Sequence, residues 1–228
     1  QVFRELSESI HNLDRYVNPA DEHRWAEFCR PLKKISAINH APTTTAFLQM
    51  GIDADGNTFA LEEHYRANQL IKEHALVMRN LIVRYGKQSP TLLNPSTDES
   101  QSASEIFSVQ NAYSREQEKT IVAQRALTEI GIDLVKEHLR VDSNRQNRFT
   151  QEKGSPRLFI SKQRCPNLLR EMMNLKLQED NGKTKYIGTD FAVTNLRNIL
   201  MSRPSPPSRY NGEKDTPVVR YQSVGPWS

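Results

Sequence analysis

Three short segments of β-type sequence follow one another near the start of the chain, and they constrain the fold more than any other feature. They span 34–38, 45–52 and 58–62 and combine apolar with β-branched residues. Asp55-Gly56, a dipeptide typical of tight turns, separates the last two segments. We therefore expect three consecutive strands that pair in the antiparallel sense.

Helical and strand-like segments alternate after these strands. The first helix is expected over 66–85, with Gly86 at its C-cap. Its apolar residues at helical spacing are Leu70, Val77, Leu81 and Tyr85. Further strands are expected at 91–93, 120–123 and 157–161. Further helices are expected over 102–116, over 127–139, from Cys165-Pro166 onward, and over 189–201. The helix over 127–139 has its apolar residues at Leu127, Ile130, Leu134 and Leu139. This order predicts an α/β fold with a mixed sheet and flanking helices.

The two ends of the chain differ from this central part. Residues 1–32 have helical spacing in their apolar residues, and Asn18 followed by Pro19 suits the start of a helix, with Asn18 as N-cap. Residues 204–228 are rich in Pro and Ser and have no period. We expect a helical lead-in over 1–32 that continues from an absent upstream region, a core domain over 33–203, and a disordered basic tail over 204–228.

The charge is uneven along the chain. The 228 residues carry a formal net charge of +4, but from residue 139 onward there are 16 Lys and Arg against 8 Asp and Glu. This excess favours a polyanion such as nucleic acid as partner, and a solvated basic surface is the alternative. Cys29 and Cys165 show no metal or redox spacing and are expected to be free thiols in a reducing compartment. No stretch approaches the length of a membrane span, so we expect no membrane association.

Polar residues end the first and fourth expected strands. Asn39-His40 follow the first strand, and Asn94 follows the fourth. Ligands in open α/β sheets gather beyond the carboxyl ends of strands. Asp190 and Thr194, one turn apart in the last helix, would join Asn39 and Asn94 if the two strands are neighbours. The alternatives are a turn role for Asn94, which precedes a proline, and a structural role for His40.

Two local motifs are interpreted as turns. Gly182-Lys183-Thr184 matches the end of a phosphate-binding loop, but the leading glycine of that motif is missing. Asp53, Asp55 and Asn57 match the start of a calcium loop, but the glutamate that should close it is His64. Both segments are therefore expected to be hairpin turns.

Five stretches in this order resemble the C-terminal nuclease domain of the large terminase subunit of tailed bacteriophages. They lie within about residues 33–203 and are Ile38–Ala46, Gly51–Asn57 leading into Glu62–Tyr65, Leu93–Thr97, Arg157–Ser161 with Cys165–Leu168, and Thr189–Arg197. The resemblance implies an RNase H-like fold and an endonuclease that cuts concatemeric DNA during genome packaging. It also implies a two-ion Mg²⁺ or Mn²⁺ site built from carboxylates, because hard anionic oxygens suit these ions.

The resemblance also implies partners and a location. The partners would be double-stranded DNA, the ATPase region of the terminase, the small terminase subunit and the portal. The location would be the cytoplasm of an infected bacterial host or of a cell that carries the prophage.

The sequence departs from the family pattern at the implied metal ligands. The strand-end acids are here Asn39 and Asn94, and the expected pair of aspartates in the last helix is Asp190 and Thr194. Two further departures are Phe191, where a histidine is common, and Asn198, where an aromatic residue is common. An amide oxygen can bind a hard cation but brings no charge, so metal affinity should fall steeply.

Three explanations stay open for these departures: natural loss of the site, deliberate inactivation, or substitution by nearby acids. The candidate substitutes are Glu62 and Glu63 at the end of the third strand and Asp98 after the fourth. Two hypotheses of function follow. The first is a DNA endonuclease with Asn39, Asn94 and Asp190 in the catalytic positions, and the second is a non-catalytic domain that binds DNA or docks in a packaging motor.

Basic residues cluster in the sequence between the last expected strand and the last helix. They are candidates for contacts with DNA phosphates, and ordinary surface charge is the alternative. The candidates are Arg157, Lys162, Arg164, Arg170, Lys183 and Lys185.

Overall fold

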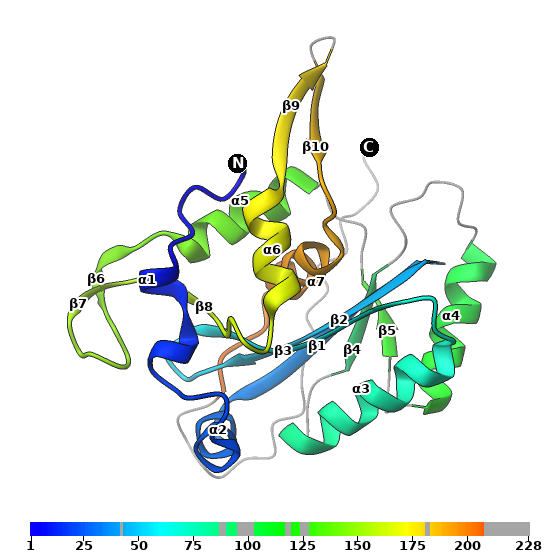
Figure 1. Cartoon of the computed structure of the whole chain (residues 1–228), viewed down its shortest axis with the longest axis horizontal. Coiled ribbons are helices and arrows are strands. Elements are labelled where there is room, and N and C mark those ends of the chain that lie inside the picture. The colour runs from blue at the N-terminus through cyan, green and yellow to red at the C-terminus, as the bar shows by residue number, and fades with distance from the viewer. Residues whose placement is uncertain are drawn as a thin grey trace, which may run out of the picture.

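A six-stranded mixed sheet lies at the centre of the molecule (Figure 1). The computed structural model describes residues 1–41, 43–86, 90–94, 103–116, 120–123, 128–180 and 183–207. In spatial order the strands are β5 (Thr120–Val122), β4 (Thr91–Asn94), β1 (Lys33–His40), β2 (Thr44–Ile52), β3 (Thr58–Ala67) and β8 (Leu158–Ile160). β1, β2 and β3 pair antiparallel, β4 and β5 run parallel to β1, and β8 runs parallel to β3. This RNase H-like order confirms the predicted α/β class.

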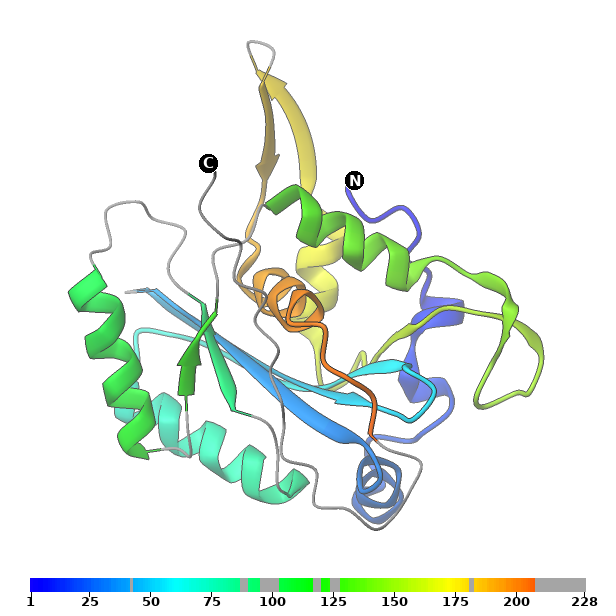
Figure 2. The same ribbon diagram turned by 180° about the vertical axis from the view of Figure 1, so that it is seen from behind.

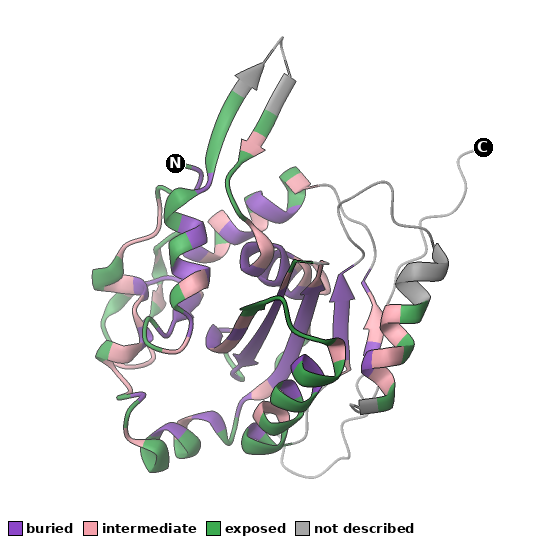
Figure 3. Ribbon diagram, turned by 45° about the vertical axis from the view of Figure 1, so that its right-hand side comes forward, coloured by how far each residue is buried: buried purple, intermediate pink, exposed green. Residues whose placement is uncertain are grey.

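Helices cover the two faces of the sheet. On one face lie α3 (Ile71–Tyr85) and α4 (Ala103–Glu116), as Figure 1 shows. The opposite face is covered by α5 (Thr128–Leu139), α6 (Pro166–Asn174) and α7 (Phe191–Met201), which lie above the sheet both in Figure 1 and in the view from behind (Figure 2). Each face has its own buried apolar cluster, and the central strands between the two layers are buried (Figure 3). Because both faces are covered, consecutive residues of β1 and β2 are buried instead of every second one.

The turn between β2 and β3 is the predicted hairpin turn. The Asp53 carboxylate accepts hydrogen bonds from the backbone N–H groups of Asp55 (2.9 Å) and Asn57 (2.8 Å) and from the Asn57 side chain (2.7 Å). Gly56 has a φ of 76°, which a residue with a side chain rarely adopts. Because Asp53 is engaged with its own turn, these residues stabilise a hairpin and are not arranged as a calcium loop.

The inner face of α3 differs from the predicted face. The buried residues are His74, Ala75, Met78 and Tyr85, whereas Leu70 and Val77 are 72% and 38% exposed. A small alanine and a flexible methionine pack against Ile38 and Phe47 of the sheet. The predicted buried face was chosen from the largest apolar residues, and it therefore differs from the observed face by part of a helical turn. In α5, Ile130 is likewise 56% exposed, and Gly131, Ile132, Val135 and Leu139 face the core.

The first 32 residues pack on the same body as the sheet. They contain α1 (Glu8–His11), a short 3-10 turn (Leu13–Arg15) and α2 (Glu22–Cys29). Phe3 is buried in the cluster under α5, α6 and α7, and Leu13 and Trp25 are buried beside Phe59 and Phe159. The N-cap of α2 is Asp21, whose side chain accepts from the Arg24 N–H at 3.1 Å.

The predicted N-cap was therefore wrong by three residues. The Asn18 side chain accepts instead from the Ala20 N–H, at 3.0 Å. Asn18 thus forms a local turn ahead of the helix, a role that Asn also favours.

Two hairpins stand outside the central sheet. β6 (Asp142–Gln146) pairs with β7 (Lys153–Ser155), and β9 (Lys176–Asp180) pairs with β10 (Lys183–Ile187). The second is the hairpin that Gly182-Lys183-Thr184 predicted, and it projects from the body (Figure 1). The first was not predicted, because its strands are polar and show no alternation of apolar residues. Asp98 and most of the expected tail, 208–228, lie outside the described residues.

No helix in the described part of the chain is long and apolar enough to cross a membrane.

Candidate functional site

The ends of β1 and β4 lie side by side, as the site prediction required. The two strands are parallel neighbours, and Asn39 is the register partner of Asn94. Both residues are buried, at 7% and 3% exposure. The backbone therefore brings the two strand-end positions together at one edge of the sheet.

The amide of Asn94 is hydrogen-bonded to helix α7. Its Nδ2 donates to Asn195 Oδ1 at 2.6 Å, and its Oδ1 accepts from Asn198 Nδ2. Asn195 is fully buried and donates in turn to the Ala46 carbonyl of β2, at 2.8 Å. Neutral amides thus connect β4, α7 and β2, and both polar atoms of the Asn94 side chain are occupied. We call Asn39, Asn94, Asn195 and Asn198 the amide centre.

Asp190 and Thr194 belong to a separate cluster on α7. Asp190 is the N-cap of the helix, and its Oδ2 accepts from Thr194 Oγ1 at 3.2 Å and from Arg197 Nη2 at 3.4 Å. Arg197 Nη2 also donates to Thr194 Oγ1, at 2.6 Å. In the described residues, no hydrogen bond joins Asp190 or Thr194 to Asn39 or Asn94. The remaining carboxylate of the predicted site is therefore paired with an internal cation.

Arg197 is an unusual residue for the interior of a domain. Its side chain is 7% exposed, and burial lowers its pKa while the Asp190 carboxylate opposes that shift. Gly131 of α5 makes the room for it, because a Cβ there would lie 3.1 Å from both Cβ and Cδ of Arg197. The guanidinium therefore brings a fixed positive charge to the start of α7.

These donors do not fit a pair of divalent cations. Two of the four predicted ligands are amides, one is a hydroxyl, and the only carboxylate already has a guanidinium beside it. A site for two dications needs several anionic oxygens, and a nearby cation repels the metal. In the described ranges, no group of three or more His, Cys, Asp or Glu is arranged to hold a metal ion.

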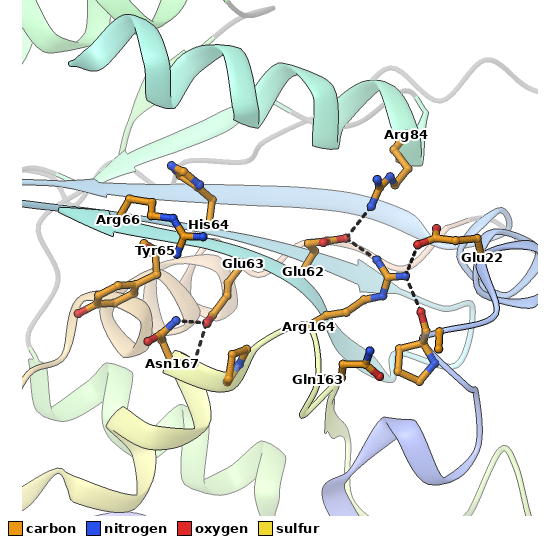
Figure 4. Close-up of a pocket in the computed structure, with 13 residues that line it drawn as sticks. Glu22, Glu62, Glu63, His64, Tyr65, Arg66, Arg84, Gln163, Arg164 and Asn167 are labelled. Atoms are coloured by element: carbon orange, nitrogen blue, oxygen red, sulfur yellow. Dashed lines mark hydrogen bonds and ion pairs between the residues drawn. The ribbon is translucent and has the colours of Figure 1, made fainter. Parts of the chain in front are cut away.

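Glu62 and Glu63, the candidate substitutes, lie on β3 at a distance from the amide centre. They are in the middle of that strand, not at its end, and β2 separates β3 from β1. Both line an open polar pocket of about 490 Å³ (Figure 4). Each carboxylate already has partners there.

Glu62 is neutralised by guanidiniums. Its Oε2 lies 2.9 Å from Arg164 Nη1 and 3.7 Å from Arg84 Nη1, and it accepts a hydrogen bond from the Tyr85 hydroxyl. Arg164 also bonds Glu22 at 2.9 Å and the Pro19 carbonyl at 2.6 Å (Figure 4). We call Glu62, Arg164, Glu22, Arg84 and Tyr85 the ion-pair network.

Glu63 caps helix α6. Its carboxylate accepts from the backbone N–H of Asn167 at 2.6 Å and of Leu168 at 2.9 Å, where the start of the helix carries partial positive charge. Burial raises the pKa of Glu63, and these hydrogen bonds oppose the shift. Its oxygens are therefore committed to the helix.

The predicted DNA-contact residues whose side chains are described differ in exposure and in pairing. Arg164 is 9% exposed and lies 4.8 Å from the ring of Trp25, so it is part of the interior. Lys162 is paired with Glu8 at 2.8 Å, and Arg157 lies 3.9 Å from Glu137. Arg170 and Lys185 are exposed, on α6 and on the β9–β10 hairpin, and the side chain of Lys183 lies outside the described part.

Two important residues were not found from the sequence. One is Arg197, and the other is Glu171, a buried carboxylate on α6 that accepts from the N–H groups of Ala192 (2.7 Å) and Val193 (3.1 Å). Glu171 also accepts from the Tyr65 hydroxyl at 2.9 Å, and burial raises its pKa. A lone Glu on the apolar face of α6 was the available signal. It fixes the start of α7 and therefore the position of Asp190.

His40 has the structural role that the sequence left as the alternative. Its Nδ1 lies 2.7 Å from Thr45 Oγ1 and 3.1 Å from the Tyr113 hydroxyl. His64 Nε2 and His74 Nδ1 are 2.9 Å apart, and the ring of His74 also contacts that of His40. The three histidines fill the space between the sheet and helices α3 and α4.

The strand order and the two helical layers define an RNase H-like α/β domain. Among solved structures, the chain is similar to the nuclease domain of g2p, the large terminase of bacteriophage SPP1, determined with bound Mn. The two are 16% identical, the match covers 88% of this chain and 98% of that one, and the TM-score is 0.54. No protein-family model and no curated protein matches the sequence. The similarity is therefore one of fold.

Proposed function

We propose that this chain is a terminase-type nuclease domain that has lost the two-metal cleavage centre and binds double-stranded DNA without cutting it, as part of a genome-packaging assembly. The similarity to the g2p nuclease domain supports the nuclease ancestry. The amide centre carries the proposal, because Asn94 is hydrogen-bonded to Asn195 and Asn198 at the position where the resemblance implies a metal-binding acid.

Charge balance makes cleavage unfavourable at this place. Two dications would enter a site in which Asn39, Asn94 and Thr194 are neutral and Asp190 is paired with Arg197. Each missing carboxylate removes one attractive interaction for each ion. The groups that a two-metal mechanism needs to hold an attacking water and a leaving oxygen are therefore missing from these positions.

DNA binding has support that does not depend on the metal. The chain from residue 139 onward has twice as many basic as acidic residues. Arg170 and Lys185 are exposed, and no ion pair to either is present in the described structure. Exposed cations of this kind neutralise phosphates and release counterions.

Incubation with supercoiled plasmid and Mn²⁺ tests the proposal. We expect the chain to retard plasmid DNA in a gel without nicking it, with an affinity that falls as salt rises. Nicking by the unmodified chain would contradict the proposal and favour the endonuclease alternative. An affinity that does not change with salt would contradict the DNA-binding part.

Restoring the acids tests the assignment of the positions. The variant with Asn39→Asp and Asn94→Asp should bind Mn²⁺ at least about tenfold more tightly than the unmodified chain, measured by calorimetry. Asn80→Asp with Asn111→Asp is the matched control, because it adds carboxylates on the exposed surfaces of α3 and α4. Equal Mn²⁺ binding by both variants would remove the amide centre as a former metal site. Mn²⁺-dependent nicking by Asn39→Asp/Asn94→Asp would confirm the catalytic assignment.

A further inference from the structure

Helix α3 exposes apolar side chains on the face turned away from the sheet. Leu76 and Val83 are 57% and 71% exposed, although Ala75 and Met78 of the same helix are fully buried. Of the nine large hydrophobic side chains exposed in the described residues, three lie on α3, and Leu70 at its N-cap is a fourth. In Figure 3, where exposed residues are green, green segments recur along the ribbon of α3. Apolar side chains exposed singly are ordinary, whereas several that gather on one element make it a candidate interaction surface.

The exposed residues form a regular stripe. Lys72, Leu76, Arg79 and Val83 follow one another at spacings of four, three and four residues, and all four are exposed. This is the spacing of the contact seam between two packed helices. The stripe is about 16 Å long, from the helical rise per residue, which is enough for three turns of a second helix. We call these four residues the α3 stripe.

The charge of the α3 stripe is positive. In the described structure, neither Lys72 nor Arg79 has an ion-pair partner. The nearest acid in sequence, Glu73, is engaged at the start of the helix, where its Oε2 accepts from the Leu70 N–H at 2.9 Å. Two cations therefore alternate with two apolar side chains along one line of the helix surface.

We propose that the α3 stripe docks an acidic amphipathic helix of a partner protein, whose apolar residues cover Leu76 and Val83 and whose carboxylates pair with Lys72 and Arg79. The alternation favours a helix as the occupant, because a helical ligand presents apolar and charged groups at the same three- and four-residue spacing. Because Lys72 and Arg79 lack ion-pair partners in the described structure, the docked helix should carry negative charge. A polyanion such as DNA would pair with the cations but leave the two apolar side chains in water. The inference goes beyond the proposed function, and it does not depend on metal or DNA.

A synthetic helix tests the proposal directly. The probe is a fluorescein-labelled three-heptad peptide with Leu at the a and d positions and Glu at e and g, where the glutamates disfavour its own dimer. The control peptide has Lys in place of every Glu. Fluorescence anisotropy should show binding of the acidic peptide at least about tenfold tighter than of the basic one, because like charges at the interface are unfavourable.

Two variants of the chain separate the apolar and electrostatic contributions. Leu76→Gln with Val83→Gln should reduce affinity for the acidic peptide at least about tenfold, because the apolar centre is lost. Lys72→Glu with Arg79→Glu should reverse the preference, so that the basic peptide binds more tightly. Ile130→Gln, at an exposed apolar residue of α5 on the other side of the sheet, is the control and should leave affinity unchanged. Thermal unfolding of each variant verifies that it is folded.

Several results would overturn the proposal. One is that the chain binds neither peptide or binds both equally. Another is that the Leu76/Val83 variant binds the acidic peptide as well as the unmodified chain does. A third is that the unmodified chain is dimeric by sedimentation and the same variant is monomeric, since a second copy would then be the occupant. These results leave the DNA-binding proposal untouched, so the two can fail separately.

Discussion

At the ends of β1 and β4 the buried polar groups are neutral amides, whereas behind β3 they are carboxylates and guanidiniums. Asn94 is paired with Asn195 and Asn198, and Glu62 is paired with Arg164. In both regions hydrogen bonds or ion pairs join the side chains, but only the second buries charge. An amide can lose its partner at the expense of a hydrogen bond, while a buried ion that loses its partner is left uncompensated. The ion-pair network should therefore contribute more to stability than the amide centre does.

The largest effect is expected from Arg164→Ala. This change leaves the Glu62 carboxylate without its closest cation and removes the contacts of Arg164 with Glu22, Pro19 and Trp25. We expect unfolding to become easier by about 3 kcal/mol, measured by urea denaturation. Arg24→Ala is the matched control, because its ion pair with Asp21 is on the surface and its side chain is 77% exposed. The control should change stability by less than about 1 kcal/mol. Equal effects would show that the network is no different from surface charge.

A smaller effect is expected from Asn195→Ala in the amide centre. The change leaves the Asn94 Nδ2 group and the Ala46 carbonyl without their present partner. Unfolding should become easier by about 2 kcal/mol, from two unsatisfied buried groups and no buried charge. Asn195→Leu keeps a similar volume without hydrogen bonds and serves to separate packing from hydrogen bonding. If Asn195→Ala costs more than Arg164→Ala, the ranking of the two regions is wrong.

The two regions also differ in how far the sequence revealed them. Strand periods and the Asp55-Gly56 turn predicted the antiparallel strands, and the parallel register of β1 and β4 then brought Asn39 beside Asn94. The ion-pair network could not be predicted in this way, because Arg164 and Glu62 are about a hundred residues apart and meet only in the folded chain. The basic residues near Arg164 in sequence were all predicted to contact DNA for the same reason. In the structure, Arg164 is instead a buried ion-pair partner and Lys162 pairs with Glu8.

The buried faces of α3 and α5 were the other features that the sequence did not predict correctly. An apolar residue such as Leu70 or Val77 looks like core in a helical pattern, but packing selects the set that fits the sheet, here with Ala75 and Met78. The same error concealed the α3 stripe, which became visible only when the buried face was known. Arg197 and Glu171 were missed because a charged residue in an apolar helix indicates a buried partner but does not identify it.

The buried histidines are a third polar group, and the pH dependence of stability measures their contribution beside those of the ion-pair network and the amide centre. Burial, aided by the charges of His74 and Arg66, lowers the pKa of His64 to about 4, and burial also lowers the pKa values of His40 and His74. The unfolded chain therefore binds more protons than the folded one between the ordinary value, near 6.5, and about 4. The contribution of the neutral histidines to the free energy of unfolding should be fully present above pH 6.5. It should be lost as the pH drops toward 4, and for His64 the loss is about 2 kcal/mol.

His64→Gln isolates this contribution. The raised pKa values of Glu63 and Glu171 act in the opposite sense, because the folded state then binds the extra proton. The difference in unfolding free energy between the unmodified chain and the variant, measured from pH 7 to pH 4.5, removes that opposing part. We expect the difference to shrink as the pH falls. A constant difference would mean that His64 is not the titrating group.

The smallest effect concerns the neutrality of the amide centre in DNA binding. If phosphates pass beside the ends of β1 and β4, Asn39→Asp with Asn94→Asp places two negative charges next to them. In EDTA, where no metal can compensate, we expect the affinity for a short DNA duplex to fall about threefold at moderate salt, and less at high salt, because salt screens the repulsion between the new carboxylates and the phosphates. Asn80→Asp with Asn111→Asp has the same net charge, on the helices that cover the other face of the sheet, and should leave the affinity within error. Equal losses for the two variants would reflect net charge alone and would separate the amide centre from the DNA path. A loss confined to the first variant would mean that amides at these two positions avoid a repulsion of phosphates that carboxylates would cause, which suits the proposed domain that holds DNA without cutting it.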